Sequence, residues 1–166
     1  LVAVLDALAA RFPELVPVEA PRAEREALLR VHTPELLAAL LQPPIGIDLH
    51  WLDSDTVLSP GSAEAALRAA GATVAATDWV LGGEHRRAFC AVRPPGHHAE
   101  PATAMGFCLF GNIAVAAAHA FAAHGLQRIA IADFDVHHGN GTQATFEREP
   151  RLLFVDTHQM PLYPGT

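Results

Sequence analysis

The sequence predicts an α/β fold, in which helices flank a parallel β-sheet. Three short apolar runs carry this prediction: RAFCAV at residues 87–92, RIAIAD at 128–133 and RLLFVD at 151–156. Helix-like segments alternate with these runs, a pattern typical of βαβ units, whose parallel strands are buried on both faces of the sheet. We therefore expect three strands, each followed by a polar loop.

Local signals place the helices between and before these runs. Thr33 is a suitable N-cap, and Pro34 suits the first helical position. Gly71, Gly82 and Gly125 are each expected to lie just beyond the end of a helix. A long loop is expected at residues 93–107. The expected helical segments are residues 1–11, 21–31, 32–41, 61–72, 73–83, 112–125 and 141–148.

The composition is that of a globular domain. The chain has 166 residues, of which 51% are hydrophobic and 17% charged, and no apolar run approaches the roughly 18 residues of a membrane span. The net charge is −7, and the eleven basic residues, all arginines, are scattered, which argues against a nucleic-acid surface. Two cysteines and no signal-peptide pattern favour a cytoplasmic location. Ten histidines predict that any metal site uses nitrogen and oxygen ligands.

The apolar runs lead into RPPGHHAE, DFDVHHGN and DTHQ, which are rich in histidines and acidic residues. Ligands of open α/β sheets bind outside the carboxyl ends of the strands. Because all three polar clusters follow predicted strands, we expect them to converge on one pocket.

Asp133, Asp135 and His137 alternate along the chain, so an extended backbone points all three side chains to one face. A carboxylate and an imidazole two residues apart can reach the same divalent ion at ~2.0–2.2 Å. Asp135 and His137 are therefore the best candidate pair of metal ligands. The same residues could instead form a general-base site, or a polar loop that caps a strand and a helix.

His97 and His98 follow a Pro-Pro-Gly turn that leaves both imidazoles available. One histidine could act as a general base toward a metal-bound water, while a polar partner orients each ring. Asp133 and Asn140 are natural partners, one charged and one neutral, and this difference would separate the pKa values of the two imidazoles. The alternative is a pair of loop histidines with satisfied hydrogen bonds.

Three stretches together closely resemble the zinc-dependent histone deacetylase family, including its bacterial members and the related acetylpolyamine amidohydrolases. They are RPPGHHAEPATAMGFCLFGNIAVAA, IADFDVHHGNGTQATFE and FVDTHQMPLYPGT, and weaker similarity extends upstream through LLRVHTPELLAAL and LDSDTVLSPGSAEAALRAAGA. The resemblance implies an arginase/deacetylase-like three-layer fold. Residues 1–166 would then be the N-terminal portion of a single deacetylase domain.

The resemblance also assigns site residues. The catalytic positions of the family match His97, His98, Asp133 and Asn140, with Asn140 typical of the class II branch. Two zinc ligands match Asp135 and His137. The third zinc ligand and a carbonyl-polarising tyrosine are expected downstream of residue 166, so the 166 residues alone are expected to bind zinc weakly and to be inactive.

Further positions match the family's substrate and cation sites. Gly106 and Phe107 match the loop that lines an acyl-lysine tunnel, Tyr163 matches the facing aromatic wall, and Asp55 matches a rim aspartate that grips the substrate backbone. A monovalent-cation site, for K⁺, matches the positions Asp133, Asp135, His137, Asp156 and Thr157.

The function that the resemblance implies is zinc-assisted hydrolysis of the acetyl amide of acetyl-lysine. His98 would be the general base that later protonates the leaving amine, and His97 would tune the electrostatics. The substrate would be an acetylated protein or peptide, histones in chromatin included, or an acetylated polyamine. An arginase-like two-metal hydrolase and a non-catalytic acetyl-lysine-binding protein are the alternatives. The Lys-free, Ala- and Arg-rich composition looks bacterial; a eukaryotic protein of this family could be nuclear.

Overall fold

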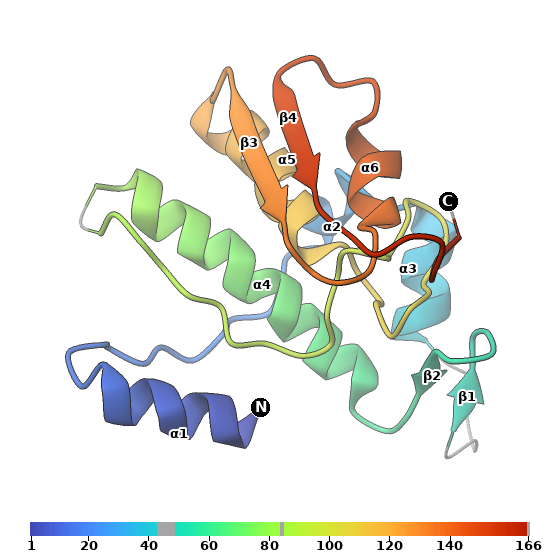
Figure 1. Cartoon of the computed structure of the whole chain (residues 1–166), viewed down its shortest axis with the longest axis horizontal. Helices are drawn as coiled ribbons and strands as arrows, with labels where there is room; N and C mark the ends of the chain where they lie inside the picture. The colour runs from blue at the N-terminus through green and yellow to red at the C-terminus, as the bar shows by residue number, and fades with distance from the viewer. Residues whose placement is uncertain (43–48, 84, 166) are drawn as a thin grey trace.

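The computed structural model describes residues 1–42, 49–83 and 85–165. Its helices gather beside a small parallel sheet, and a short antiparallel hairpin lies to one side (Figure 1). None of the helices in these three ranges combines the length and apolar character that a membrane-spanning helix requires. In chain order the elements are α1 (Val2–Arg11), α2 (Arg25–Leu29), α3 (Pro34–Leu41), β1 (His50–Trp51), β2 (Val57–Leu58), α4 (Ser62–Leu81), α5 (Asn112–His124), β3 (Ile129–Asp133), α6 (Asn140–Phe146) and β4 (Leu152–Asp156).

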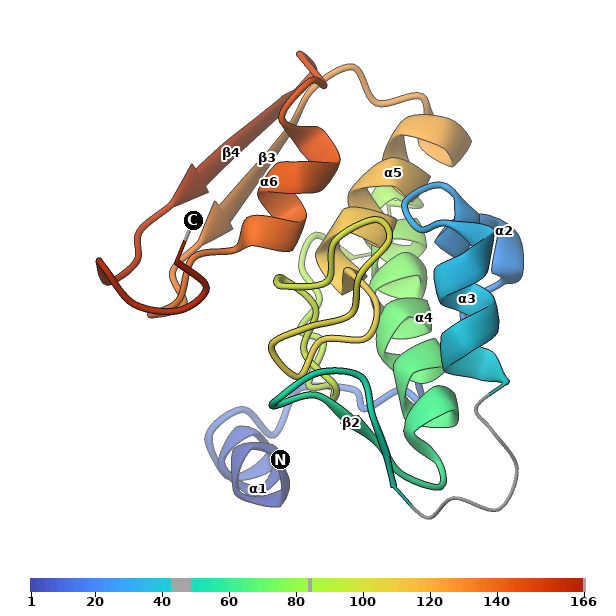
Figure 2. The same ribbon diagram turned by 90° about the vertical axis from the view of Figure 1, so that its right-hand side faces the viewer.

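Strands β3 and β4 confirm the predicted α/β class. They pair in parallel, with Ile129 opposite Leu152 and Asp133 opposite Asp156, and α6 lies on the connection between them. Helices α5 and α6 cover one face of this sheet (Figure 2). The other face carries Leu153, which is 61% exposed. The expectation of a sheet buried on both faces is therefore wrong for the part of the chain that the structure describes.

The first apolar run, residues 87–92, is not a strand. It runs as irregular chain near α4, where the Cys90 thiol donates a hydrogen bond to the Ala72 carbonyl at 3.6 Å. Phe89 is 68% exposed. A strand requires a neighbour to complete its hydrogen-bond ladder, and the described residues place none beside this run. Apolar composition alone therefore predicted the wrong structure.

Helix α4 is a single helix, although the sequence predicts two that meet near Gly71. Gly71 is a packing position: a Cβ there would overlap the Pro21 carbonyl oxygen. The absence of a side chain lets α4 lie directly against residues 21–23, and the Ala23 N–H donates to the Leu67 carbonyl at 2.9 Å. This contact keeps residues 21–24 out of a helix, so α2 is shorter than the predicted segment 21–31.

Three further predicted helix boundaries match the structure. Thr33 caps α3, because its side chain accepts the Leu36 N–H at 3.2 Å. The Gly82 N–H donates to the Asp78 carbonyl where α4 ends. Gly125 ends α5 in the left-handed region, with φ of 65°, a conformation that glycine adopts without strain.

The core lies between α4, α5 and the short helices α2 and α3. Leu28, Leu37, Phe110 and Val115 are fully buried. The facing surfaces of α4 and α5 are rich in buried alanines, which let the two helix backbones approach closely. Phe110 anchors the end of the long loop 93–111 in this core, and the same loop carries the tandem histidines.

His32 ties the N-terminal helices to that loop. Its side chain is 2% exposed; Nε2 accepts the Gly111 N–H at 2.9 Å, and Nδ1 lies 3.2 Å from the Glu100 carbonyl oxygen. Since Nε2 accepts, the ring is neutral and Nδ1–H donates. Burial lowers the pKa of His32, despite the opposing backbone carbonyls of Pro101 and Glu100.

This lowered pKa predicts acid sensitivity. Below the ordinary histidine pKa of about 6.5, His32 binds a proton in the unfolded chain but stays neutral in the folded protein. The free energy of unfolding therefore falls as the pH drops from 6.5 toward the lowered pKa of the folded state. Urea unfolding of wild type and His32→Gln between pH 8 and pH 5 measures this. We expect a smaller loss of stability on acidification in the variant; equal losses in both proteins would contradict the assignment.

Candidate active site

The candidate site lies beyond the carboxyl ends of β3 and β4. The Thr157 N–H donates to the Asp133 carbonyl at 3.1 Å, and the Gln159 N–H donates to the Val136 carbonyl at 2.8 Å. These bonds hold the two loops that follow the strands side by side. The loop at residues 93–107 reaches the same place, so the three polar clusters converge at one edge of the sheet.

His97 is held by Asp133. Its Nδ1 lies 2.9 Å from Asp133 Oδ2, and both side chains are largely buried, at 16% and 14% exposure. Gly139 makes room for the pair, since a Cβ there would lie 2.6 Å from Asp133 Oδ2. The carboxylate therefore fixes the plane of the ring and leaves Nε2 of His97 free to face the site.

His98 is held by a neutral partner. Its Nδ1 lies 2.8 Å from Asn140 Oδ1, and the Asn140 amide nitrogen donates to Glu100 Oε1 at 2.9 Å. The Glu100 contact sets the orientation of the amide, so the oxygen of Asn140 must accept from Nδ1–H of His98. In this tautomer Nε2 of His98 carries the lone pair. The imidazoles of His97 and His98 lie against each other at a tilt of 41°, with centroids 4.0 Å apart.

The backbone around the two histidines is tightly fixed. The N–H groups of Gly141 and Thr142 both donate to the His97 carbonyl, at 2.9 and 3.2 Å. A Cβ on Gly141 would overlap the backbone of Ala99 and His98. The start of α6 therefore lies directly on the tandem histidines, which sets the position of Asn140 relative to His98.

The two partners separate the protonation behaviour of the imidazoles. Burial lowers the pKa of His97, but the hydrogen bond and charge of Asp133, with Asp135 and Asp156 nearby, outweigh it and raise the pKa overall. Burial also lowers the pKa of His98, where neutral Asn140 compensates only in part and the His97 and His137 rings add to the decrease. His98 is thus the neutral ring, and His97 is the one that favours a proton.

Asp135 and His137 lie beside this pair. Their closest side-chain atoms, Asp135 Oδ1 and His137 Nδ1, are 3.3 Å apart, and both side chains are about half exposed. The His137 ring centroid is 6.0 Å from that of His98. One carboxylate and one imidazole suit zinc chemically. Among the described residues, no other His, Cys, Asp or Glu joins them in a compact group of three ligands.

A loop and an aromatic ring border the histidines. Gly106 and Phe107 both have positive φ, 57° and 64°, and a Cβ on Gly106 would overlap the His98 ring. Glycine is thus required where the loop crosses His98, and the turn leaves Phe107 62% exposed. The Tyr163 ring meets His98 edge-on, with centroids 4.9 Å apart.

The β1–β2 hairpin, which the sequence analysis missed, places Asp55. The Asp53 side chain accepts the N–H groups of Asp55 and Thr56, at 2.9 and 2.7 Å. The Thr56 hydroxyl donates to Asp55 Oδ1 at 2.7 Å and accepts the Phe107 N–H at 3.1 Å. Burial, together with the charges of Asp55 and Asp53, raises the pKa of Tyr163 to about 12. Asp55 therefore belongs to the rim of the same site.

Asp156 lies behind the candidate site, and its carboxylate is enclosed by donors. Oδ2 accepts the Gly139 N–H at 2.8 Å and lies 2.8 Å from His138 Nδ1, while Oδ1 lies 2.8 Å from His158 Nδ1. Both carboxylate oxygens are thus already engaged. Potassium at this position stays a prediction from the resemblance.

Glu100, Thr56 and His32 are three of the residues in this region that the sequence analysis missed. Each acts by orienting another group: Glu100 orients Asn140, Thr56 fixes Phe107, and His32 fixes the loop at Gly111. Glu100 lies two residues after His98, which is the only local signal for any of them. The partners of Thr56 and His32 are 51 and 79 residues away in the chain.

A family model of the histone deacetylase domain matches residues 1–166. The chain belongs to the histone deacetylase family. A solved structure of the HDA15 HD domain superposes with a TM-score of 0.93 at 39% identity, over 99% of this chain and 47% of that one. The fold is therefore that of histone deacetylase domains, as the sequence predicted.

Curated relatives of this histone deacetylase-family chain come from distant organisms. A histone deacetylase-like amidohydrolase of Pseudomonas aeruginosa is 47% identical over 87% of this chain and 38% of its own length. A probable deacetylase of Archaeoglobus fulgidus is 43% identical over 92% of this chain and 42% of its own. A polyamine deacetylase, HDAC10 of Rattus norvegicus, is 45% identical over 82% and 24%. The chain thus spans less than half the length of these relatives.

Proposed function

We propose that the protein is a zinc-dependent hydrolase that removes acetyl groups from acetylated amines, with the side chain of acetyl-lysine as the substrate class. The observation that carries this proposal is the pairing of the tandem histidines with unlike partners. His97 contacts the Asp133 carboxylate, and His98 contacts the Asn140 amide, immediately beside Asp135 and His137. Amide hydrolysis needs one group that accepts a proton and surroundings that stabilise developing charge.

His98 is the general base in this proposal. Its Nδ1–H is committed to Asn140, so Nε2 is available to accept a proton from the attacking water and return it to the leaving amine nitrogen. The lowered pKa of His98 keeps this ring neutral near pH 7. His97, whose pKa Asp133 raises, is the ring that holds a proton more readily. When protonated, it would stabilise the negative charge that develops on the substrate oxygen.

Asp135 and His137 are the residues that would hold zinc. When bound, zinc acts as a Lewis acid that polarises the acetyl carbonyl and makes water more acidic. The oxygen and nitrogen donors and their half-exposed position beside His98 fit this role.

The surroundings favour a slender, uncharged acyl-amine stem. Phe107 and Tyr163 border the histidines with aromatic rings, and Asp55 lies at the rim. Aromatic rings pack well on a methylene chain, whereas the Asp55 carboxylate attracts cationic amines and peptide N–H groups. The similarity to a named polyamine deacetylase supports acetylated polyamines as a second candidate substrate.

A substrate panel on the full-length protein tests the proposal. We expect release of acetate from an acetyl-lysine peptide and no release from N-acetylglutamate, because Asp55 and the net charge of −7 disfavour anionic ligands. N-acetylated putrescine separates the polyamine alternative from the peptide. Failure to hydrolyse any of the acetylated amines would refute the proposed activity and leave a non-catalytic acetyl-lysine-binding role.

A further inference from the structure

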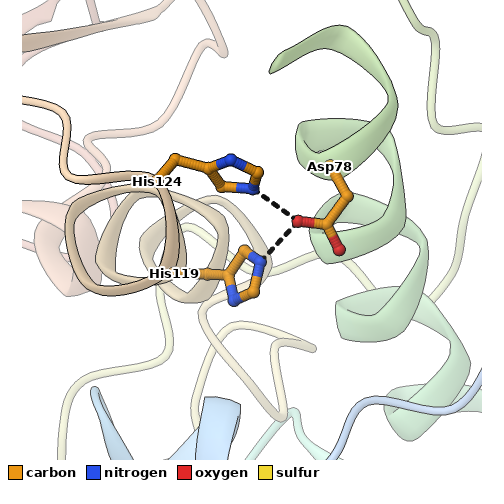
Figure 3. Close-up of side chains that lie close together, drawn as sticks. All are labelled: Asp78, His119 and His124. Atoms are coloured by element: carbon orange, nitrogen blue, oxygen red, sulfur yellow. Dashed lines mark hydrogen bonds and ion pairs between the residues drawn. The ribbon is translucent and has the colours of Figure 1, made fainter. Parts of the chain in front are cut away.

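A second group of metal-ligating side chains lies between α4 and α5. Asp78 projects from α4, and His119 and His124 project toward it from α5 (Figure 3). Asp78 Oδ1 lies 2.6 Å from Nε2 of His119 and 2.7 Å from Nε2 of His124. The deacetylation site is beyond the carboxyl end of β3, whereas α5 ends before the amino end of that strand. The two groups are therefore at opposite ends of the sheet.

The three donor atoms have the chemistry and spacing of a metal site. They are one carboxylate oxygen and two imidazole nitrogens, all within 4.8 Å of one another. The ligand atoms of a tetrahedral zinc ion, each ~2.0–2.2 Å from the metal, are about 3.4 Å apart. The Asp78 oxygen thus needs to move only a fraction of an ångström farther from each of the two nitrogens to admit an ion. Two imidazoles and a carboxylate suit late first-row divalent cations.

Solvent reaches this group. The Asp78 side chain is 49% exposed and that of His124 is 26% exposed, while His119 is 13% exposed. A cavity of about 290 Å³ borders Asp78 and His119, and Glu24 and Glu26 also line it. Arg22 and Arg30 line the same cavity, so the charge of its wall is mixed. An ion can still enter from solvent, and water can complete its coordination.

Arg30 opposes metal binding at this group and therefore limits the affinity for the ion. Its Nη1 lies 2.9 Å from His119 Nδ1, so the guanidinium donates and Nδ1 accepts. This arrangement puts the ring proton on Nε2, the atom that would bind the metal. A metal-bound histidine instead donates from its other nitrogen to an acceptor. Arg30 must therefore turn away, and Glu26, 2.9 Å from Arg30 Nη2, offers it a partner.

We propose that Asp78, His119 and His124 form a second divalent-cation site, of which zinc is the representative ion. The ion takes the place of the two N–H protons that now bridge the histidines to Asp78. Each imidazole then carries its proton on Nδ1, and water fills the remaining positions of the ion. It joins the middle of α5 and its last residue to α4, so its role is to stabilise the packing of these helices. The proposal is independent of the deacetylase function.

Zinc stoichiometry of the full-length protein tests this site. Equilibrium dialysis at micromolar free zinc, followed by metal analysis, is expected to show one more equivalent in wild type than in Asp78→Asn or His124→Gln. His85→Gln is the control, because His85 is an exposed histidine near the end of α4 that stacks on Trp79 and has no part in the group. Asp135→Asn is expected to keep the second equivalent. Equal zinc content in wild type and His124→Gln would overturn the proposal and leave only hydrogen bonds between the helices.

Substitution of Arg30 separates metal binding from a purely structural role. Arg30→Gln removes the competing donor and offers a carbonyl oxygen to Nδ1–H of His119. Zinc affinity at this site is therefore expected to rise about tenfold, which is the usual effect of a hydrogen bond to the second nitrogen of a metal-binding histidine. The thermal midpoint should then rise more steeply with added zinc than in wild type. Affinity that is unchanged or weaker in Arg30→Gln would contradict the assignment of these ligands.

Discussion

Replacing His98 with alanine in the full-length protein is expected to lower kcat/KM for an acetyl-lysine peptide by about 10²–10⁴-fold, the usual contribution of a general acid–base group. His98 is the ring whose Nδ1 is committed to a neutral acceptor, so its Nε2 is the proposed proton acceptor. The substitution removes both the acceptance of a proton from water and its return to the leaving amine. Steady-state kinetics of wild type and variant measure the loss.

Asn140→Asp is the matched variant for this prediction. It keeps an oxygen that accepts from His98 Nδ1 but adds a negative charge, which favours the protonated imidazole and raises its pKa. The acid limb of the pH–rate profile is therefore expected to move to higher pH, while zinc content stays unchanged. A His98→Ala protein with activity within tenfold of wild type, or an Asn140→Asp profile that does not move, would refute the role of His98 as the base.

The convergence of the polar clusters after β3 and β4 could be predicted because both clusters follow strands. In a parallel sheet the residues after each strand reach the same edge, and the polar loops after β3 and β4 do so here. The partners of the tandem histidines could be anticipated for the same reason, since Asp133 ends β3 and Asn140 begins α6. Asp133, Asp135 and His137 occupy alternate positions in the chain, which accounts for their place in the same region.

Tertiary contacts decided the features that local patterns predicted wrongly. Gly71 resembles a helix terminator in the sequence, but it lies inside α4 because residues 21–23 cross the helix there. Residues 87–92 have the composition of a strand, but none of the strands in the described part of the chain lies beside them. In both cases the nearest neighbours in space come from distant parts of the chain.

Orienting residues are the least visible in sequence. Thr56 contacts Phe107 across 51 residues, and Asp78 meets His119 across 41. A threonine in a short hairpin, or a histidine in an alanine-rich helix, has no local pattern that marks it. Glu100 is close to His98 in the chain, but its role follows only from the structure, in which Asn140 contacts both residues.

Asp135→Asn carries the second large expected effect, because Asp135 is one of the two residues proposed to hold zinc. Loss of the carboxylate charge weakens the attraction for the ion and leaves His137 as the single donor from residues 1–166. Deacetylation of the peptide is expected to fall by at least 10²-fold, with a matching loss of bound zinc at limiting concentrations. Asp6→Asn is the control, because it makes the same chemical change on the surface of α1. This variant should retain wild-type activity and zinc content.

The most direct test of the central claim, zinc-dependent hydrolysis at this site, is to remove and restore zinc in the full-length protein. After dialysis against a chelator, wild type is expected to lose hydrolysis of the acetyl-lysine peptide and to regain it when about one equivalent of zinc is returned to the catalytic site. Asp135→Asn should not recover under the same conditions. Hydrolysis that persists in zinc-free wild type, or a fully restored Asp135→Asn protein, would contradict the account.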